Sequence, residues 1–190
     1  CAIAVQQICN EVLKLNNAPG IFSLLIGGGS TVGETLIKDK KVPLISFTGS
    51  TKLGRHVNEV VSSRFGKTIL ELGGNNCIIV DQTADMDMAV PAIVFGAVGT
   101  AGQRCTSLGN LILHKDIYDE FMEKFMAKVK TTRIGDSLKH DDVLYGSMLS
   151  EKYAVDFLKG IDMVEADGAT KIWGQGRISS GNTPENFQGT

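Results

Sequence analysis

The chain has 190 residues, of which 43% are hydrophobic, and its 19 basic and 21 acidic side chains give a net charge of −2. This composition is typical of a globular protein with a buried core, and it argues against disorder and against a basic surface that binds nucleic acid. The longest uncharged apolar stretch, Met88 to Gly102, is shorter than the ~20 residues that a helix needs to span a bilayer, so no membrane partner is expected.

The first third of the chain alternates between helical and extended patterns. Apolar spacing predicts a helix over Ala2–Leu15, and a short apolar run predicts a strand over Ile21–Ile26. A short helix, a strand, a longer helix and a third strand are then expected over Ser30–Lys38, Val42–Phe47, Thr51–Phe65 and Lys67–Leu70. The β-α-β-α-β order predicts an α/β fold with a parallel sheet and crossover helices.

The pattern changes after Gly73 and Gly74, so we predict two partial domains, residues 1–71 and 72–190. In the second, strands are expected over Cys77–Val80 and Leu108–His114. Helices are expected over Met86–Val98, capped by Asp85 and containing Pro91, over Asp116–Lys130, capped by Asp116, and over Ser150–Glu165. The tail Gly174–Thr190 is rich in Gly, Ser, Asn and Pro, and is predicted to be loop.

The turn after the predicted strand 42–47 is a candidate phosphate site. Thr48, Gly49 and Ser50 lead directly into a helix, whose N-terminal N–H groups and dipole favour an anion. Gly49 would let a ligand approach closely, and Gly54 would let the helix pack on the sheet. The alternative is an ordinary helix with Ser50 as its N-cap, because the spacing is not that of the G-x-G-x-x-G fingerprint.

Two residues are candidates for chemistry on a carbonyl group. Glu71 ends a predicted buried strand before two glycines, where shielding from water suits a general base. Cys105 follows Arg104 in a glycine-containing segment, where an exposed thiol beside a cation suits a nucleophile. The alternatives are an exposed glutamate beside a turn and a buried structural cysteine.

The remaining cysteines give no sign of a disulfide framework or a metal site. Cys1, Cys9 and Cys77 lie in apolar runs, no C-x-x-C pair is present, and no histidine stands at ligand spacing. A reduced intracellular protein is the simplest interpretation, and no metal is predicted.

Three segments together resemble the NAD(P)-dependent aldehyde dehydrogenase superfamily. They are Phe47-Thr48-Gly49-Ser50-Thr51, Leu70-Glu71-Leu72-Gly73-Gly74 and Gly102-Gln103-Arg104-Cys105. Asn75-Asn76 and the run Val98–Thr106 are most similar to the antiquitin group of that superfamily, whose members oxidise α-aminoadipic semialdehyde in lysine breakdown. The resemblance implies part of a Rossmann-like cofactor domain followed by part of a catalytic domain.

The resemblance also implies a role for each matching residue. Cys105 would be the nucleophile, and its backbone N–H would supply part of an oxyanion hole; Glu71 would activate the water that releases the acid. The dinucleotide, NAD with NADP not excluded, would be bound by Thr48, Gly49, Ser50, Gly54 and Leu72. Arg104 would recognise the distal carboxylate of a small aldehyde substrate.

Some features depart from the family pattern. Cys77 replaces a small residue, and Gly109-Asn110 replaces two arginines of the antiquitin group. The family's oxyanion asparagine and ribose lysine would precede Cys1, and its ribose glutamate would follow Thr190, so we expect the 190 residues alone to be inactive. The family implies a homodimer or homotetramer in the cytoplasm or the mitochondrial matrix.

Two alternatives to an aldehyde dehydrogenase that hydrolyses its thioester stay open. A CoA-acylating semialdehyde dehydrogenase would pass the acyl group to CoA instead of water, but that branch typically lacks a base at the position of Glu71. A relative kept for binding or for a structural role would have lost catalysis, and the presence of both Cys105 and Glu71 argues against it.

Overall fold

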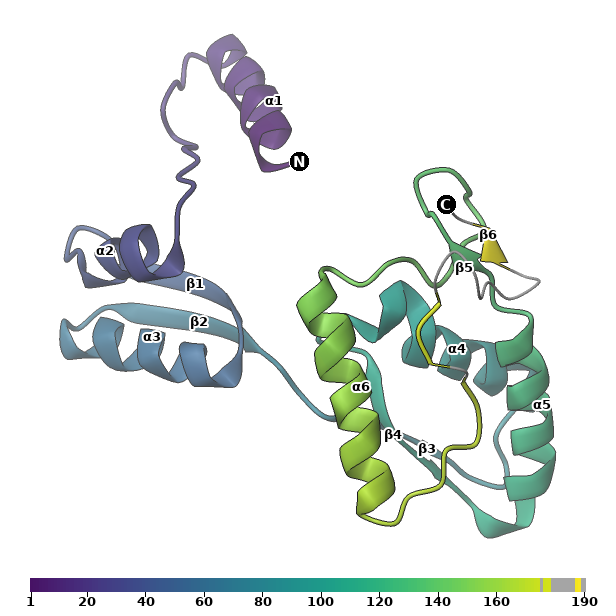
Figure 1. The fold of residues 1–190 in the computed structure, drawn as a ribbon. Coiled ribbons are helices and arrows are strands. Elements are labelled where there is room, and N and C mark those ends of the chain that lie inside the picture. Colours follow the sequence, from purple (N-terminus) through teal and green to yellow (C-terminus); the bar gives the residue numbers. More distant parts are fainter. Residues whose placement is uncertain (175, 179–186, 189–190) are drawn as a thin grey trace. The chain divides into compact units, whose positions relative to one another are not determined.

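The computed structural model of the protein describes residues 1–174, 176–178 and 187–188. The chain divides into two compact units, Cys1–Gly73 and Gly74–Thr190 (Figure 1), and each is described by itself. Within the described part of the chain, no helix is long and apolar enough to cross a membrane.

The first unit is built around a pair of parallel strands. Its elements are α1 (Ala2–Leu15), a π-helical turn (Gly29–Gly33), α2 (Glu34–Lys38), β1 (Leu44–Gly49), α3 (Thr51–Ser63) and β2 (Lys67–Leu72). β1 and β2 pair in parallel from Leu44 opposite Lys67 to Gly49 opposite Leu72. Four buried side chains from α2, β1 and α3 form its core: Ile37, Ile45, Val57 and Val61. The β1-α3-β2 order confirms the predicted α/β fold with a crossover helix.

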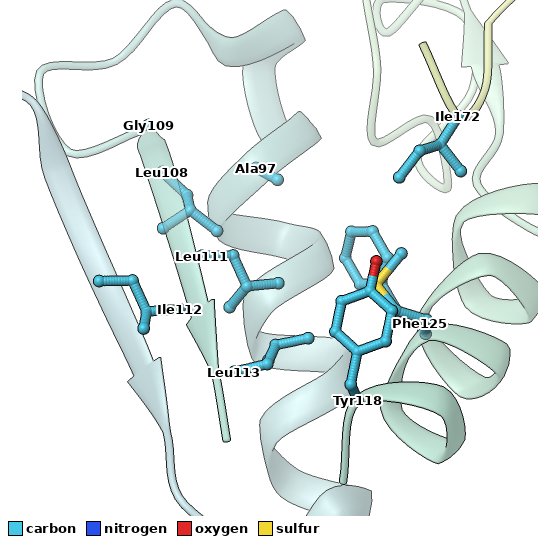
Figure 2. Close-up of a pocket in the computed structure, with 10 residues that line it drawn as sticks. Ala97, Leu108, Gly109, Leu111, Ile112, Leu113, Tyr118, Phe125 and Ile172 are labelled. Carbon is cyan, nitrogen blue, oxygen red and sulfur yellow. The ribbon is translucent and has the colours of Figure 1, made fainter. Parts of the chain in front are cut away.

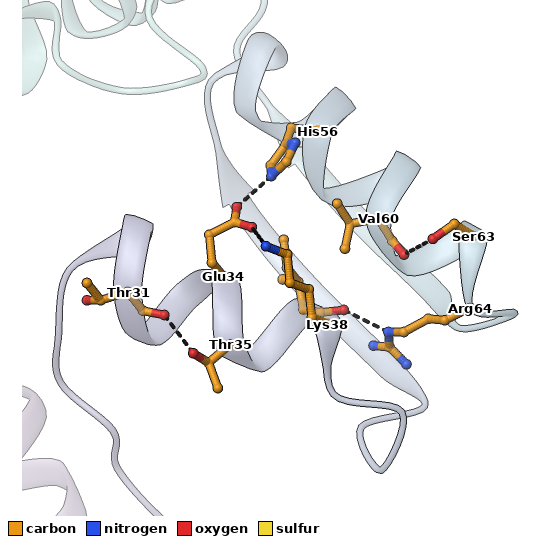
Figure 3. Close-up of polar contacts among 9 residues, drawn as sticks. Thr31, Glu34, Thr35, Lys38, His56, Val60, Ser63 and Arg64 are labelled. Carbon is orange, nitrogen blue, oxygen red and sulfur yellow. Dashed lines mark hydrogen bonds and ion pairs between the residues drawn. The ribbon is translucent and has the colours of Figure 1, made fainter.

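Polar side chains connect α2 to α3 beside this core (Figure 3). The Glu34 carboxylate lies 3.0 Å from Lys38 Nζ and 2.5 Å from His56 Nε2, and Arg64 Nε donates to the Ile37 carbonyl at 2.7 Å. The hydrogen bonds from Lys38 and then from His56 lower the pKa of Glu34 below its ordinary value. The charged form of the carboxylate is therefore favoured by the Lys38 ammonium group on α2 and by a hydrogen bond to His56 on α3.

The strand predicted over Val42–Phe47 is shifted to Leu44–Gly49, so Thr48 and Gly49 lie in β1 and not in the predicted turn. Two further predictions for the first unit are wrong. Residues 21–26 form no strand, and Ile21, Leu25 and Ile26 are exposed, since no strand in the described residues pairs with this segment. The helix predicted to Phe65 ends at Ser63, and Phe65 is 98% exposed rather than on the buried face. The reason is the helix end: Gly66 N–H bonds the Val61 carbonyl at 2.9 Å, which closes a C-terminal turn with Phe65 at a φ of 63°.

The second unit contains a parallel pair of strands covered by helices. Its elements are β3 (Asn76–Val80), α4 (Met86–Val98), a 3₁₀ turn (Gly99–Gly102), β4 (Leu108–Leu113), a 3₁₀ turn (Lys115–Ile117), α5 (Tyr118–Lys130), β5 (Ile134–Gly135), α6 (Glu151–Ala166) and β6 (Phe187–Gln188). β3 pairs with β4, and β5 with β6, both in parallel. The core joins β3, α4, the 3₁₀ turn before α5, and α5 itself; its buried side chains are Val80, Val90, Ile93, Ile117 and Phe121.

The predicted cap of α4 is confirmed, and the predicted cap of α5 is wrong. Asp85 Oδ1 accepts from the N–H groups of Asp87 and Met88 at 2.9 and 3.2 Å, and α4 continues through Pro91. Asp116 lies inside the 3₁₀ turn, where its own N–H donates to His114 Nδ1 at 3.3 Å, so α5 begins only at Tyr118. A histidine ring thus takes the capping position that the sequence assigned to a carboxylate.

The prediction of loop throughout the tail is wrong at two residues. Instead, Phe187 and Gln188 form β6 opposite Ile134 and Gly135. A two-residue strand has too little sequence for a period-2 pattern to be recognised. The prediction for residues 175, 179–186 and 189–190 lies outside the described residues.

Candidate functional site

The carboxyl ends of β1 and β2 bring most of the predicted cofactor residues together. Thr48 lies opposite Glu71, and Gly49 lies opposite Leu72, because the strands are parallel and in register. Ser50 follows directly as the N-cap of α3. Thr48, Gly49, Ser50 and Glu71 are all exposed at this edge. Thr48 and Glu71 are therefore neighbours at this end of the strand pair, and Gly49 and Ser50 lead into the N-terminus of α3.

The N-terminus of α3 has N–H groups and a charge environment that suit an anion. Ser50 Oγ accepts from Leu53 N–H at 3.2 Å, which confirms the predicted N-cap. In the described residues the N–H groups of Thr51 and Lys52 have no protein acceptor, and the first turn of α3 contains no acidic side chain. Free N–H groups at the positive end of a helix of 13 residues suit a phosphate group. Capping and anion binding therefore use different donors and are compatible.

Gly54 allows α3 to lie against the end of β2. The residue is buried, and a Cβ atom built on it would lie 2.3 Å from Leu72 Cδ2 and 3.2 Å from Leu72 Cγ. Any larger residue would displace the leucine or lift the helix. Gly54 and Leu72 thus act on the turn by packing, as predicted for Gly54.

Glu71 does not have the environment that was expected of it. Its side chain is exposed, whereas the prediction placed it at the shielded end of a buried strand. The burial pattern of β2 alternates, with Thr68, Leu70 and Leu72 half-buried, so the period of 2 places Glu71 on the other face. Glu71 belongs to the first unit and Cys105 to the second.

Cys105 is exposed on a turn between the 3₁₀ segment Gly99–Gly102 and β4. The alternative of a buried structural cysteine is therefore wrong for this residue. Its N–H has no protein acceptor within the described residues, so a polar donor lies beside the thiol. Exposure alone does not single out Cys105, because Cys1 and Cys77 are exposed too.

The backbone before Cys105 is in an unusual conformation. Thr100, Ala101 and Gly102 have φ values of 56°, 55° and 68°, a left-handed region that costs a β-branched residue free energy. The segment is fastened to residues much later in the chain. Thr100 N–H donates to the Leu144 carbonyl at 3.2 Å, and Gln103 Oε1 accepts from Leu149 N–H at 2.8 Å. Gln103 Nε2 also donates to the Ser147 carbonyl at 3.3 Å.

The segment after Cys105 is fastened to β3. Asn76 Nδ2 donates to the carbonyls of Cys105 and Ser107, at 2.7 and 2.9 Å. Asn76 and Gln103 lie in motifs singled out in the sequence, but the sequence predicts no contact for either. The available signal was a polar amide at the start of an apolar strand, which a strand pattern alone does not explain.

Arg104 makes its contacts with α4. Its guanidinium lies 4.4 Å from the ring centroid of Phe95, and Nη2 donates to the Phe95 carbonyl at 2.7 Å. The cation therefore binds near the C-terminus of α4, where the Phe95 carbonyl accepts from both Arg104 and the Gly99 N–H. A carboxylate would have to bind through the remaining guanidinium donors or displace the arginine from the ring.

An apolar cavity of about 600 Å³ lies elsewhere in the second unit (Figure 2). It is lined by side chains of β4 and α5 such as Leu111, Tyr118 and Phe125, with Ile172 on another side. Neither Arg104 nor Cys105 lines it. This cavity is thus separate from the candidate nucleophile.

Comparison with known proteins identifies similar chains. A family model described as "Aldehyde dehydrogenase family" matches residues 1–189. An α-aminoadipic semialdehyde dehydrogenase of Mus musculus is 39% identical over 173 residues, which cover 91% of this chain and 32% of the relative. The chain therefore spans about a third of the length of the curated relatives that it matches.

Solved structures share the fold. A glyceraldehyde-3-phosphate dehydrogenase from Methanocaldococcus jannaschii, complexed with NADP, is 34% identical with a TM-score of 0.86, over 93% of this chain and 38% of its own. A betaine aldehyde dehydrogenase from Staphylococcus aureus, in complex with NAD⁺, is 29% identical with a TM-score of 0.76, over 86% of this chain and 33% of its own.

Proposed function

The chain belongs to the aldehyde dehydrogenase family, and from that premise we propose that the full-length protein oxidises an aldehyde to a carboxylic acid. The observation that carries the proposal is Cys105, an exposed thiol on a turn beside its own N–H, which has no acceptor in the described residues. A nucleophile next to a fixed donor is the arrangement needed to attack a carbonyl carbon and hold the resulting oxyanion.

The reaction begins at the Cys105 sulfur. The thiolate attacks the aldehyde carbon, a C–S bond forms, and the carbonyl oxygen becomes an oxyanion that the Cys105 N–H stabilises. Loss of hydride from that carbon restores the C=O bond and leaves a thioester on Cys105. Water then attacks the thioester while Glu71 accepts its proton, the C–S bond breaks, and the thiolate is regenerated with the acid released. Glu71 is exposed in the first unit, so its carboxylate is accessible to this water without the shielding that the sequence predicted.

The hydride acceptor is NAD or NADP, which supplies an electrophilic nicotinamide when bound. Thr48, Gly49 and Ser50 would hold the dinucleotide at the edge of the strand pair, and the free N–H groups of Thr51 and Lys52 suit its phosphates. Gly54 and Leu72 support this turn by packing beneath it. The solved relatives include complexes with either dinucleotide, and we propose NAD with NADP as the alternative.

The proposed substrate is α-aminoadipic semialdehyde, an intermediate of lysine catabolism. It is supported by the similarity to the Mus musculus dehydrogenase named for that substrate. Arg104 is the proposed ligand of its distal carboxylate, through guanidinium donors other than the one that binds the Phe95 carbonyl. We also propose that the full-length protein is a homodimer or homotetramer in the cytoplasm or the mitochondrial matrix, as its family suggests.

The first test is NADH formation by the full-length protein. Turnover with α-aminoadipic semialdehyde should exceed turnover with a plain aliphatic aldehyde, and Cys105→Ser should reduce it at least ~1,000-fold. Cys77→Ser is the matched control, since it removes another exposed thiol and should leave the rate unchanged. Equal rates with both aldehydes would remove the substrate assignment, and no Cys105-dependent NADH with either would overturn the proposed activity.

The second test separates hydrolysis from acyl transfer to CoA. Glu71→Gln should release about one NADH per subunit in a burst and then stall, because the thioester forms but water is not activated. Hydrolysis of the thioester by the unmodified protein should not depend on CoA. If CoA accelerates turnover severalfold and Glu71→Gln has no effect, the protein is an acylating enzyme instead.

A further inference from the structure

Asn76 binds the turn that carries the candidate nucleophile at two points. It is the first residue of β3, and its amide nitrogen donates to the carbonyls of Cys105 and Ser107 at 2.7 and 2.9 Å. A primary amide has two N–H donors, so both of them are used on this one turn. The side chain is half-buried; its bond to the Ser107 carbonyl is partly buried, and its bond to the Cys105 carbonyl is exposed.

The strand geometry at Asn76 is adapted to this contact. The β3–β4 register shifts between Asn76 and Cys77, so that Asn76 lies opposite Leu108 and Cys77 lies opposite Asn110. The extra residue, Gly109, comes so close that a Cβ atom there would lie 2.2 Å from Asn75 Oδ1. Such bulges turn a side chain away from the direction that a regular ladder would impose.

Other hydrogen bonds of the turn next to Cys105 lie within the turn itself. Within it, Ser107 N–H donates to the Arg104 carbonyl at 3.0 Å, and Ser107 Oγ accepts from Arg104 N–H at 3.1 Å. These bonds close the turn upon itself but do not attach it to the sheet. Asn76 makes that attachment and fixes the peptide plane that follows Cys105.

We propose that Asn76 is a positioning residue for Cys105, which holds the nucleophile and its N–H in the orientation needed for attack. The inference rests on the proposed role of Cys105, and Asn76 itself touches neither substrate nor cofactor in this assignment. Fixing the Cys105 carbonyl constrains the rotation of the backbone about that residue, and a shift of about 1 Å in a reacting atom can cost ~100-fold in rate.

The decisive variant is Asn76→Asp in the full-length protein. The aspartate has the same shape, but once ionised it cannot donate and places a negative charge against two carbonyl oxygens. We expect kcat to fall about 10- to 100-fold with the aldehyde KM changed by less than about threefold. Asn76→Ser keeps one donor without a charge, so its kcat should lie between those of the unmodified protein and Asn76→Asp. Asn110→Asp, which breaks only the bond to Asn75, should retain the unmodified kcat.

A thiol-labelling measurement separates positioning from folding. Iodoacetamide should alkylate Cys105 more slowly in Asn76→Asp than in the unmodified protein, with half-buried Cys9 labelled at an unchanged rate in the same sample. Unchanged kcat and Cys105 labelling in folded Asn76→Asp and Asn76→Ser would overturn the proposal. Faster labelling of both cysteines in both variants would also overturn it, because Asn76 would then be a folding residue.

The outcomes also distinguish this inference from the proposed function. If the unmodified protein forms NADH through Cys105 while both Asn76 variants match it, only the positioning role fails. If the unmodified protein forms no NADH, the proposed function fails, and the labelling rates of Cys105 still decide whether Asn76 orients it.

Discussion

The turn at Gly49-Ser50 and the turn at Cys105 are held in place by different kinds of interaction. In the first, Ser50 caps α3 by accepting from Leu53 N–H three residues ahead, and Gly54 packs on Leu72 of β2. The second depends on residues far away in sequence. Asn76 reaches Cys105 across 29 positions, and Gln103 reaches Leu149 across 46. Each turn carries proposed site residues, but only the first has its main hydrogen bond, from Leu53 N–H to Ser50, within its own segment.

This difference predicts which property a substitution changes. The Gly49-Ser50 turn is built on a helix that packs into the core of the first unit, so a defect there should lower stability. The Cys105 turn is exposed and contributes no side chain to a core cluster, so a defect there should lower reactivity first.

The largest effect on stability is expected from Gly54→Val. The new side chain would overlap Leu72, whose nearest atom lies 2.3 Å from the position of a Cβ, and the helix would have to move off β2. Overpacking of this kind costs about 1–3 kcal/mol in the free energy of unfolding. Chemical denaturation of the full-length protein measures it, and NAD affinity should fall in parallel because the turn is displaced.

Gly160→Ala is the matched control for that experiment. Gly160 lies inside α6, and a Cβ atom there would meet nothing within 4 Å. The alanine should raise stability by about 0.5–1 kcal/mol through helix propensity. If Gly54→Val were as stable as the unmodified protein, the close approach of α3 to β2 would not depend on the glycine.

The sequence predicted what depends on short-range patterns. The boundaries of α1 and α4, the Asp85 cap and the Ser50 cap follow from apolar spacing and from the chemistry of single residues. The prediction of a strand over Ile21–Ile26 is wrong because a strand requires a partner strand, which the segment itself does not specify.

The same limit explains the errors at the candidate site. The exposure of Cys105 agrees with the prediction, whereas that of Glu71 does not, because it depends on which face of β2 is packed. The Arg104 contact with Phe95 and the bonds of Asn76 and Gln103 join residues separated by 9 to 46 positions. No local period encodes such contacts, so they became visible only in the structure.

A second prediction separates the two roles of Ser50. Aspartate is as good an N-cap as serine, so Ser50→Asp should keep the bond to Leu53 N–H and leave the melting temperature almost unchanged. Its charge would repel a phosphate at the same helix N-terminus, and we expect NAD affinity to fall about tenfold or more. Calorimetric titration with NAD measures the affinity.

Ser50→Ala provides the reciprocal control. It removes the cap without adding a charge, and should lower stability by about 1 kcal/mol. Equal NAD affinity in Ser50→Asp and the unmodified protein would mean that the anion does not bind at this helix end. The capping role would then be the whole role of Ser50.

The smallest effect on stability is expected at Glu34, which joins α2 to α3 through polar contacts and not through a cap or apolar packing. Glu34 has a pKa lowered by Lys38 and then by His56, so its folded pKa lies below the unfolded value near 4.5. A depressed pKa stabilises the fold above the unfolded pKa, and this contribution is lost as the pH falls through the folded pKa. Glu34→Gln should therefore lower the melting temperature slightly, by less than about 2 °C near neutral pH.

That deficit should shrink as the pH falls below about 4.5 and as salt is raised, because protonation or screening removes the same attraction from the unmodified protein. Glu120→Gln is the matched control: it breaks the 2.8 Å pair with Lys124 inside one helix, α5, and should have a smaller effect near neutral pH. A Glu34→Gln deficit that persists unchanged at low pH would mean that the side chain supports α2 by its shape. The contacts between α2 and α3 would then stabilise the unit through the fit of the side chains, as Gly54 does against Leu72, and not through charge.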